Sequence, residues 1–108
     1  MSNHLIQSEQ NRILSLIKSD PSVDRVFLFG SAVEPNRLHE ESDIDLCIVQ
    51  KTDLPFYDRL AEWINRIQPE VGIDLVVYTP QEFEEMVSDN YFVRAEIAGK
   101  GKEIYHAA

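Results

Sequence analysis

Two short apolar segments separated by a polar stretch constrain this fold most. Residues 24–29 and 43–49 are rich in residues that favour β-strands, and Gly30 ends the first segment. Short apolar segments of this kind are typical of strands buried on both faces. Residues 34–42, between them, predict a polar loop. The segment therefore predicts two buried strands joined by a polar loop.

The rest of the chain alternates helical and strand patterns. Residues 5–18 carry apolar side chains at helical spacing, and Pro21 follows the predicted helix. A second helix is expected from Asp53, as N-cap, to about Gln68, with an apolar stripe of Phe56, Leu60, Trp63, Ile64 and Ile67. Residues 71–78 predict a third strand.

The last third predicts two helices and a strand. Thr79, Pro80 and Glu82 form a capping-box pattern that predicts a helix ending near Asp89. Residues 91–98 predict a short helix, and residues 103–105 a terminal strand. The order α-β-β-α-β-α-α-β indicates an α/β (α+β) fold, a small mixed β-sheet with flanking helices, in one domain spanning residues 1–108.

Composition excludes several classes of function. The chain has 108 residues and a formal net charge of -9, which disfavours non-specific binding to nucleic acid. No apolar stretch is long enough to span a bilayer, and no signal peptide is evident, so we expect no membrane association. The single cysteine, Cys47, lies inside an apolar segment and predicts a buried thiol in a cytoplasmic protein.

Three aspartates interrupt the apolar strands. Asp43 and Asp45 are two residues apart, so their side chains share one face of the second strand, and Asp74 reaches that face if the second and third strands are neighbours. Three converging carboxylates suit Mg²⁺ or Mn²⁺ and phosphoryl transfer. Taken alone, the Asp43–Asp45 pair is as consistent with a structural role as with a metal-binding role. Asp74 favours the metal-binding role, because burying a carboxylate without a partner costs free energy.

A Gly-Ser pair follows the first strand. Gly30 permits a tight turn and close approach of a phosphate group to the backbone, and Ser31 with the backbone N–H groups after it could donate hydrogen bonds to phosphate oxygens. We expect these phosphate donors at one edge of the sheet and the metal ligands at the other. A glycine and serine at this position alone would more often mark an ordinary turn.

Together these residues resemble the minimal nucleotidyltransferase (MNT) family of the polymerase-beta superfamily. The resemblance is carried by Gly30-Ser31, by Ser42-Asp43-Ile44-Asp45-Leu46 and by Ile73-Asp74-Leu75-Val76. It implies that Asp43 and Asp45 are metal ligands, that Asp74 is the third catalytic and metal-binding carboxylate, and that Gly30 and Ser31 hold the triphosphate.

The resemblance also implies a reaction and a partner. The expected reaction is Mg²⁺-dependent transfer of a nucleoside monophosphate, AMP from ATP, to a hydroxyl of a HEPN-domain protein that this chain would neutralise as an antitoxin. One departure stands out: Glu34 occupies a position where the family often has arginine, and Arg37 or His39 would have to supply that charge.

That departure keeps an alternative open, an inactive MNT-like module that neutralises its HEPN partner by occlusion. A third class is a domain that a metal ion merely stabilises. The sequence does not decide between a homo-oligomer and a hetero-oligomer.

Overall fold

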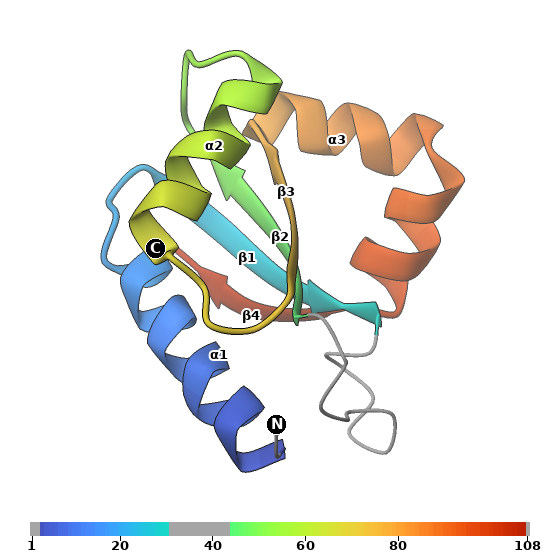
Figure 1. Cartoon of the computed structure of the whole chain (residues 1–108). Coiled ribbons are helices and arrows are strands. Elements are labelled where there is room, and N and C mark those ends of the chain that lie inside the picture. The colour runs from blue at the N-terminus through green and yellow to red at the C-terminus, as the bar shows by residue number, and fades with distance from the viewer. Residues whose placement is uncertain (1–2, 31–43, 108) are drawn as a thin grey trace.

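One mixed four-stranded sheet forms the centre of the computed structural model, which describes residues 3–30 and 44–107 (Figure 1). The strands are β1 (Val23–Phe29), β2 (Ile44–Gln50), β3 (Ile73–Tyr78) and β4 (Lys102–His106), in the order β3-β2-β1-β4. Strand β1 runs antiparallel to β2 and β4, whereas β2 and β3 are parallel. The predicted mixed sheet is confirmed, and so is the condition that the second and third strands are neighbours.

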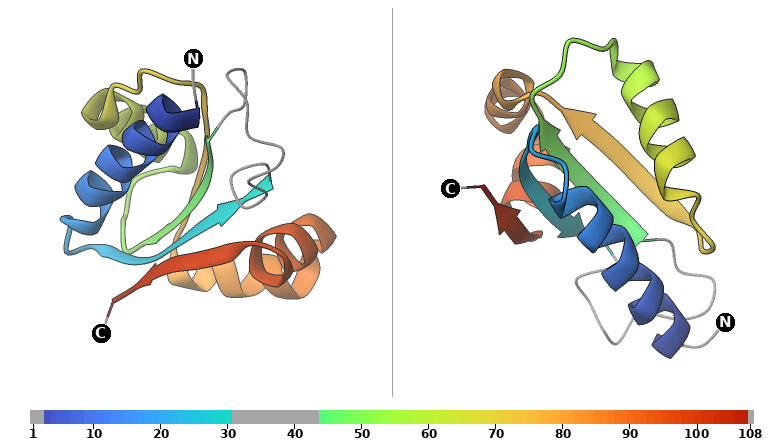
Figure 2. Two further views of the ribbon diagram at one scale, coloured as in Figure 1. Left: turned by 90° about the horizontal axis from the view of Figure 1, so that it is seen from below. Right: turned by 90° about the vertical axis from the view of Figure 1, so that its left-hand side faces the viewer.

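Helices cover both faces of this sheet. They are α1 (Asn3–Lys18), α2 (Phe56–Ile67), α3 (Pro80–Asp89) and the π-helix η3 (Val93–Gly99), and the order of elements along the chain is the predicted one. Figure 2 shows α1 and α2 on one face of the sheet and α3 with η3 on the other. Among the described residues, no helix is long and apolar enough to cross a bilayer.

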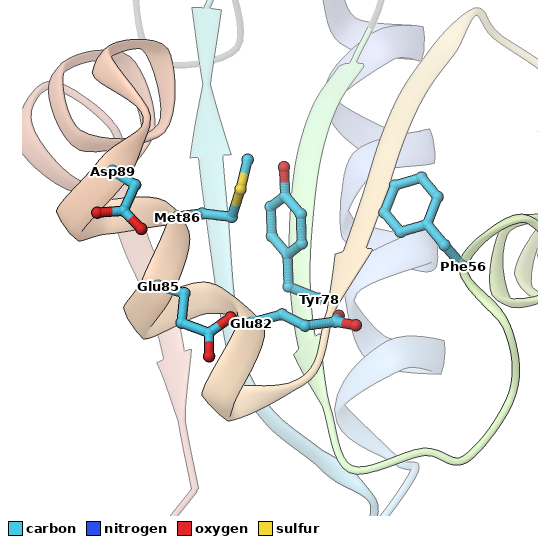
Figure 3. A pocket seen from close by; sticks show the side chains of 6 residues that line it. All are labelled: Phe56, Tyr78, Glu82, Glu85, Met86 and Asp89. Carbon is cyan, nitrogen blue, oxygen red and sulfur yellow. The ribbon is translucent and has the colours of Figure 1, made fainter.

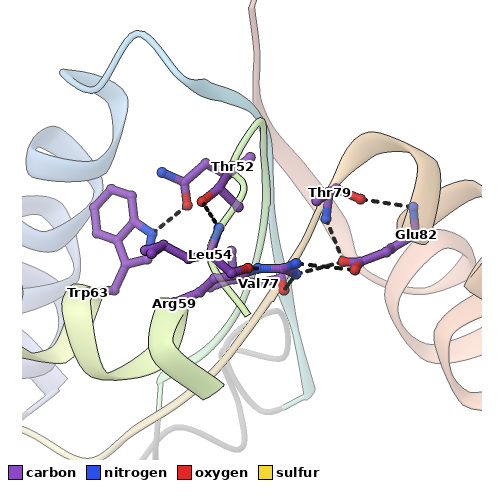
Figure 4. Close-up of polar contacts among 8 residues, drawn as sticks. Thr52, Leu54, Arg59, Trp63, Val77, Thr79 and Glu82 are labelled. Atoms are coloured by element: carbon purple, nitrogen blue, oxygen red, sulfur yellow. Dashed lines mark hydrogen bonds and ion pairs between the residues drawn. The ribbon is translucent and has the colours of Figure 1, made fainter. Parts of the chain in front are cut away.

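The face covered by α1 and α2 holds a core of mainly aliphatic side chains. Its strand residues alternate along β2, as a period of two requires. The buried side chains of this core are Ile6, Ile13, Leu14, Ile17, Val23, Val26, Leu28, Ile44, Leu46, Ile48, Trp63, Ile67, Val71, Leu75 and Val77. The buried Trp63 indole donates a hydrogen bond to Gln50 Oε1 (2.9 Å), so its polar group is satisfied (Figure 4).

The face covered by α3 and η3 holds a smaller core that is richer in aromatic residues. Its buried side chains are Phe27, Phe29, Cys47, Val49, Phe83, Val93 and Ile97. The rings of Phe27 and Phe83 stack with centroids 5.1 Å apart. Cys47 is buried as predicted, and burial raises the pKa of its thiol to about 12.

The capping box of α3 is confirmed, but the predicted start of α2 is wrong. Glu82 N–H donates to Thr79 Oγ1 and Thr79 N–H to Glu82 Oε1, as the sequence pattern predicts. Helix α2, by contrast, begins at Phe56 with Pro55 as N-cap and no side-chain capping bond, so Asp53 is not the cap. The proline fixes an extended conformation before the helix, which moves its start beyond reach of Asp53.

Helix α2 also differs from prediction in what it buries. Ile64, expected in the apolar stripe, is exposed, whereas Arg59 is buried. The Arg59 guanidinium donates to Leu54 O, to Val77 O and to the Glu82 carboxylate, which joins α2, β3 and α3 (Figure 4). A buried arginine of this kind is stable because each of its three nitrogens donates to an oxygen atom.

Candidate functional site

The candidate residues that the structure describes, Gly30, Asp45 and Asp74, lie at the end of the sheet where β1 finishes and β2 and β3 begin (Figure 1). Gly30 directly follows β1, and Asp45 lies opposite Phe29 in the antiparallel pairing of β1 with β2. The expectation that phosphate donors and carboxylates occupy opposite edges is therefore wrong. Antiparallel pairing brings the last residues of β1 beside the first residues of β2, so both chemistries share one corner.

Glycine is required at position 30 for two reasons. Its φ of +61° lies in the left-handed region that side-chain-bearing residues seldom adopt. A Cβ atom placed on Gly30 would also collide with Oδ2 of Asp45. The Asp45 carboxylate thus lies against the glycine backbone, where a larger residue would displace it.

Asp45 and Asp74 form a cross-strand pair. They are direct partners in the parallel register of β2 and β3, about 5 Å apart between strands. By strand alternation, Asp45 shares the face of Cys47 and Val49, and Asp74 that of Val76 and Tyr78, which is the face covered by α3 and η3. The structure brings these two predicted carboxylates together.

The burial expected for Asp74 is wrong. Asp74 is exposed on β3, the outermost strand of the sheet at this side, and Asp45 is half-buried. The cost of a buried, unpaired carboxylate therefore gives no argument for a site at Asp74. What remains is the register, which sets the two carboxylates side by side on one face of the sheet.

Several predicted residues lie outside the described ranges. These are Ser31 and Asp43 of the candidate site, and Glu34, Arg37 and His39 of the polar segment. Within residues 3–30 and 44–107, no group of three or more potential ligand side chains is clustered for a metal ion.

The Asp45–Asp74 pair nevertheless fits a magnesium ion that arrives with a nucleotide. Mg²⁺ is commonly held by one or two carboxylates together with substrate phosphates and water, rather than by a complete protein cage. Two aspartates on one sheet face, beside the glycine that follows β1, match the carboxylate part of such a coordination shell.

A cavity lies further along the same face, between β3 and α3. Its volume is about 280 Å³, and its lining comprises Phe56, Tyr78, Glu82, Glu85, Met86 and Asp89 (Figure 3). Tyr78 lies four residues beyond Asp74, or about 13 Å along the strand, so the cavity is separate from the Asp45–Asp74 pair. Burial raises the pKa of the Tyr78 phenol, which stays protonated at neutral pH.

Sequence reasoning missed the aromatic side of this corner. Phe29 is buried beside Gly30, and its ring contacts that of Phe92 edge-on, with centroids 5.9 Å apart. Phe92 is 52% exposed. The available signal was the adjacent pair Tyr91-Phe92 in an otherwise polar stretch, but the sequence does not show that the chain returns this pair to the end of β1.

Comparison with known proteins identifies a family and a fold. Residues 11–107 match the family described as "Polymerase beta, Nucleotidyltransferase". No curated protein matches the chain.

Three solved structures share the fold. A candidate nucleotidyltransferase from Sulfolobus solfataricus is 17% identical, with a TM-score of 0.58 over 98% of this chain and 90% of that one. A variant of the toxin–antitoxin complex MntA-HpeT is 20% identical, with a TM-score of 0.54 over 91% of this chain and 72% of that one. A toxin–antitoxin structure with AMP-PNP is 19% identical, with a TM-score of 0.51 over 91% of this chain and 73% of that one.

The family match spans nearly the whole chain and includes the strands that carry Gly30, Asp45 and Asp74. It confirms the resemblance to the polymerase-beta superfamily that these residues indicated. The chain therefore belongs to the polymerase beta nucleotidyltransferase family.

Proposed function

We propose that this nucleotidyltransferase moves a nucleoside monophosphate, AMP from ATP, to a hydroxyl group on a HEPN-type partner protein, which it thereby neutralises as an antitoxin. The observation that carries the proposal is the Asp45–Asp74 register pair beside Gly30 in a chain of this family. The toxin–antitoxin proteins that share the fold, one of them with AMP-PNP, fit this choice of nucleotide and partner.

The proposed roles follow from the position of each residue. Gly30, whose left-handed backbone turns the chain at the end of β1, and Ser31 would hold the triphosphate. Asp45, half-buried against Gly30, and Asp43 would hold Mg²⁺ at the phosphates, and Asp74 would add a third carboxylate. When bound, Mg²⁺ would neutralise phosphate charge and polarise the reacting phosphoryl group.

Asp74 is also placed to act on the acceptor. It is exposed on the outer strand, on the side of Asp45 away from Gly30, where a hydroxyl from another protein can approach. In the proposed reaction the hydroxyl oxygen bonds to the α-phosphorus, the bond to the β-phosphate bridge breaks, and pyrophosphate leaves. Asp74 aligns the hydroxyl and accepts its proton.

The test is label transfer from α-labelled ATP with Mg²⁺ in a lysate of the native host. We expect one labelled protein band with the native chain, none with Asp45→Asn, and an unchanged band with Asp58→Asn, which removes an exposed carboxylate on α2. A band that survives Asp45→Asn would contradict the proposed site.

The occlusion alternative rests on the sequence departure at Glu34. It predicts that the Asp45→Asn chain still neutralises its partner, with no labelled band from either chain. Loss of neutralisation in Asp45→Asn, with binding to the partner retained, would exclude occlusion.

A further inference from the structure

The junction of α3 and η3 presents two consecutive aromatic side chains to solvent. Tyr91 is 73% exposed and Phe92 is 52% exposed. Exposed apolar residues are common, so exposure alone does not identify a binding surface. Of the two, Phe92 has a described ring contact, with Phe29 at 5.9 Å and an interplanar angle of 84°.

The backbone at this junction is held in place on both sides. Asn90 Oδ1 accepts a hydrogen bond from Val93 N–H (3.1 Å), and Arg94 donates to Ser88 O (2.9 Å) at the end of α3. Val93, directly after Phe92, is buried in the core under α3 and η3. Phe92 therefore extends from a fixed position, which lowers the entropic cost of using its ring to bind a ligand.

The segment that follows has an unusual helical form. Residues Val93–Gly99 form a π-helix, in which Lys100 N–H bonds to Ala95 O five residues before it (2.9 Å). Such helices are rare, and they are frequent at functional sites because the extra residue in a turn redirects neighbouring side chains. Here the π-helix begins directly after Phe92.

The sheet order places Phe92 on the nucleotide side of the corner. Phe29 precedes Gly30 on β1, pairs across the sheet with Asp45 and contacts the Phe92 ring, so a single side chain separates Phe92 from the residues of this corner. A nucleotide whose phosphates are held at Gly30 can extend its base past one phenylalanine side chain. Asp74, proposed to align the acceptor, lies on the other side of Asp45.

We propose that Phe92 is the stacking surface for the nucleobase of the bound nucleoside triphosphate. This inference rests on the proposed function, which places the triphosphate at Gly30 and Asp45. Stacking on a single ring tolerates any base, because every base has a π-face. Phe92 thus adds affinity for a nucleoside triphosphate over inorganic polyphosphate.

The test measures binding of Mg·ATP and of Mg·tripolyphosphate, which lacks ribose and base, to the full chain by calorimetry. Loss of a base–aromatic stack weakens binding by roughly ten-fold or more. We expect Phe92→Ala to lower the affinity for Mg·ATP by that factor and to leave the affinity for Mg·tripolyphosphate within about two-fold of the native value. Phe92→Trp should retain ATP affinity, and Tyr91→Ala should change neither ligand.

Three results would overturn the inference. Equal weakening of both ligands in Phe92→Ala would mean that Phe92 only supports the corner through Phe29. Unchanged ATP affinity in Phe92→Ala, with slower transfer to the partner, would mean that Phe92 contacts the acceptor protein and not the nucleobase. If the native chain binds neither ligand, the proposed function itself fails and the inference with it. Phe92→Leu, which keeps apolar packing on Phe29 without a ring, should lose ATP affinity as Phe92→Ala does.

Discussion

The two faces of the sheet differ in what they bury and in what they leave open. Strand β2 supplies Ile44, Leu46 and Ile48 to the face under α1 and α2, and every one of these is fully buried. On the opposite face the same strand supplies Cys47 and Val49 to the core, but its first position there is Asp45. Along β2, the α1–α2 face is buried from one end to the other, whereas the α3–η3 face has a carboxylate, Asp45, at its first position.

This difference teaches how so small a domain combines stability with chemistry. The α1–α2 face holds most of the buried apolar side chains, and none of its fully enclosed core side chains is titratable. The α3–η3 face has a smaller core, borders the cavity between β3 and α3, and carries Asp45 and Asp74 at one end. We therefore expect substitutions on the first face to reduce stability, and those at the corner of the second to reduce ligand binding.

Trp63→Ala should give the largest effect on stability. Trp63 is 1% exposed in the α1–α2 core, and truncation of a buried tryptophan costs about 3–5 kcal/mol in the free energy of unfolding. Trp63→Phe should cost less, about 1–3 kcal/mol, mainly through the lost bond to Gln50. Urea unfolding measures both. Loss of Mg·ATP binding in a folded Trp63→Phe chain would show that the two faces are not separable.

Gly30→Ala should separate the two faces in the opposite sense. The positive φ and the collision with Asp45 together cost about 1–3 kcal/mol of stability, similar to Trp63→Phe. Because the new methyl group displaces the Asp45 carboxylate, Mg·ATP binding should fall far more than in Trp63→Phe. Calorimetry on both variants makes the comparison. Equal ATP affinity in Gly30→Ala and the native chain would show that this corner holds no phosphate.

The Arg59–Glu82 ion pair tests how the two faces are joined, since it links α2 to α3 (2.6 Å). The bond from Arg59 lowers the pKa of Glu82 below its ordinary 4.5. Stability from the pair is therefore complete above pH 4.5 and is lost as the pH falls through the lowered folded-state pKa. At neutral pH the native chain should have a higher melting temperature than the Glu82→Gln variant. This difference in melting temperature should disappear in acid. A difference in melting temperature that does not change with pH would show that ionisation of Glu82 does not contribute to stability.

Cys47 gives the smallest expected signal, a rate of thiol labelling. It is fully buried on the α3–η3 face, and its pKa of about 12 leaves almost no thiolate at pH 8. A thiol reagent should react with the unfolded chain and only very slowly with the native one. Fast labelling of the native chain would show that the α3–η3 face opens readily.

The strand pattern predicted much of this structure because alternation is local information. The period of two placed Asp45 and Asp74 on predictable faces, and the capping box fixed the start of α3. The parallel pairing of β2 with β3 supplied the convergence that the sequence could state only as a condition.

What the sequence missed depends on contacts between distant segments. Arg59 is buried because its donors meet oxygens of Val77 and Glu82, about twenty residues further along the chain. The Phe29–Phe92 contact joins two segments whose proximity is set only by the return of the chain through η3 to β4. Asp74 was expected to be buried, yet β3 is an outer strand whose first residues remain open to solvent.

The central claim, that Asp45 and Asp74 act as one unit, is tested most directly by a double-mutant cycle. Mg²⁺-dependent ATP binding is measured for Asp45→Asn, Asp74→Asn and the double variant. If both carboxylates serve one cation, the second substitution should cost much less than it does alone, a coupling of about 0.5–3 kcal/mol. Additive effects, or Mg²⁺-dependent binding that survives in the double variant, would contradict the account.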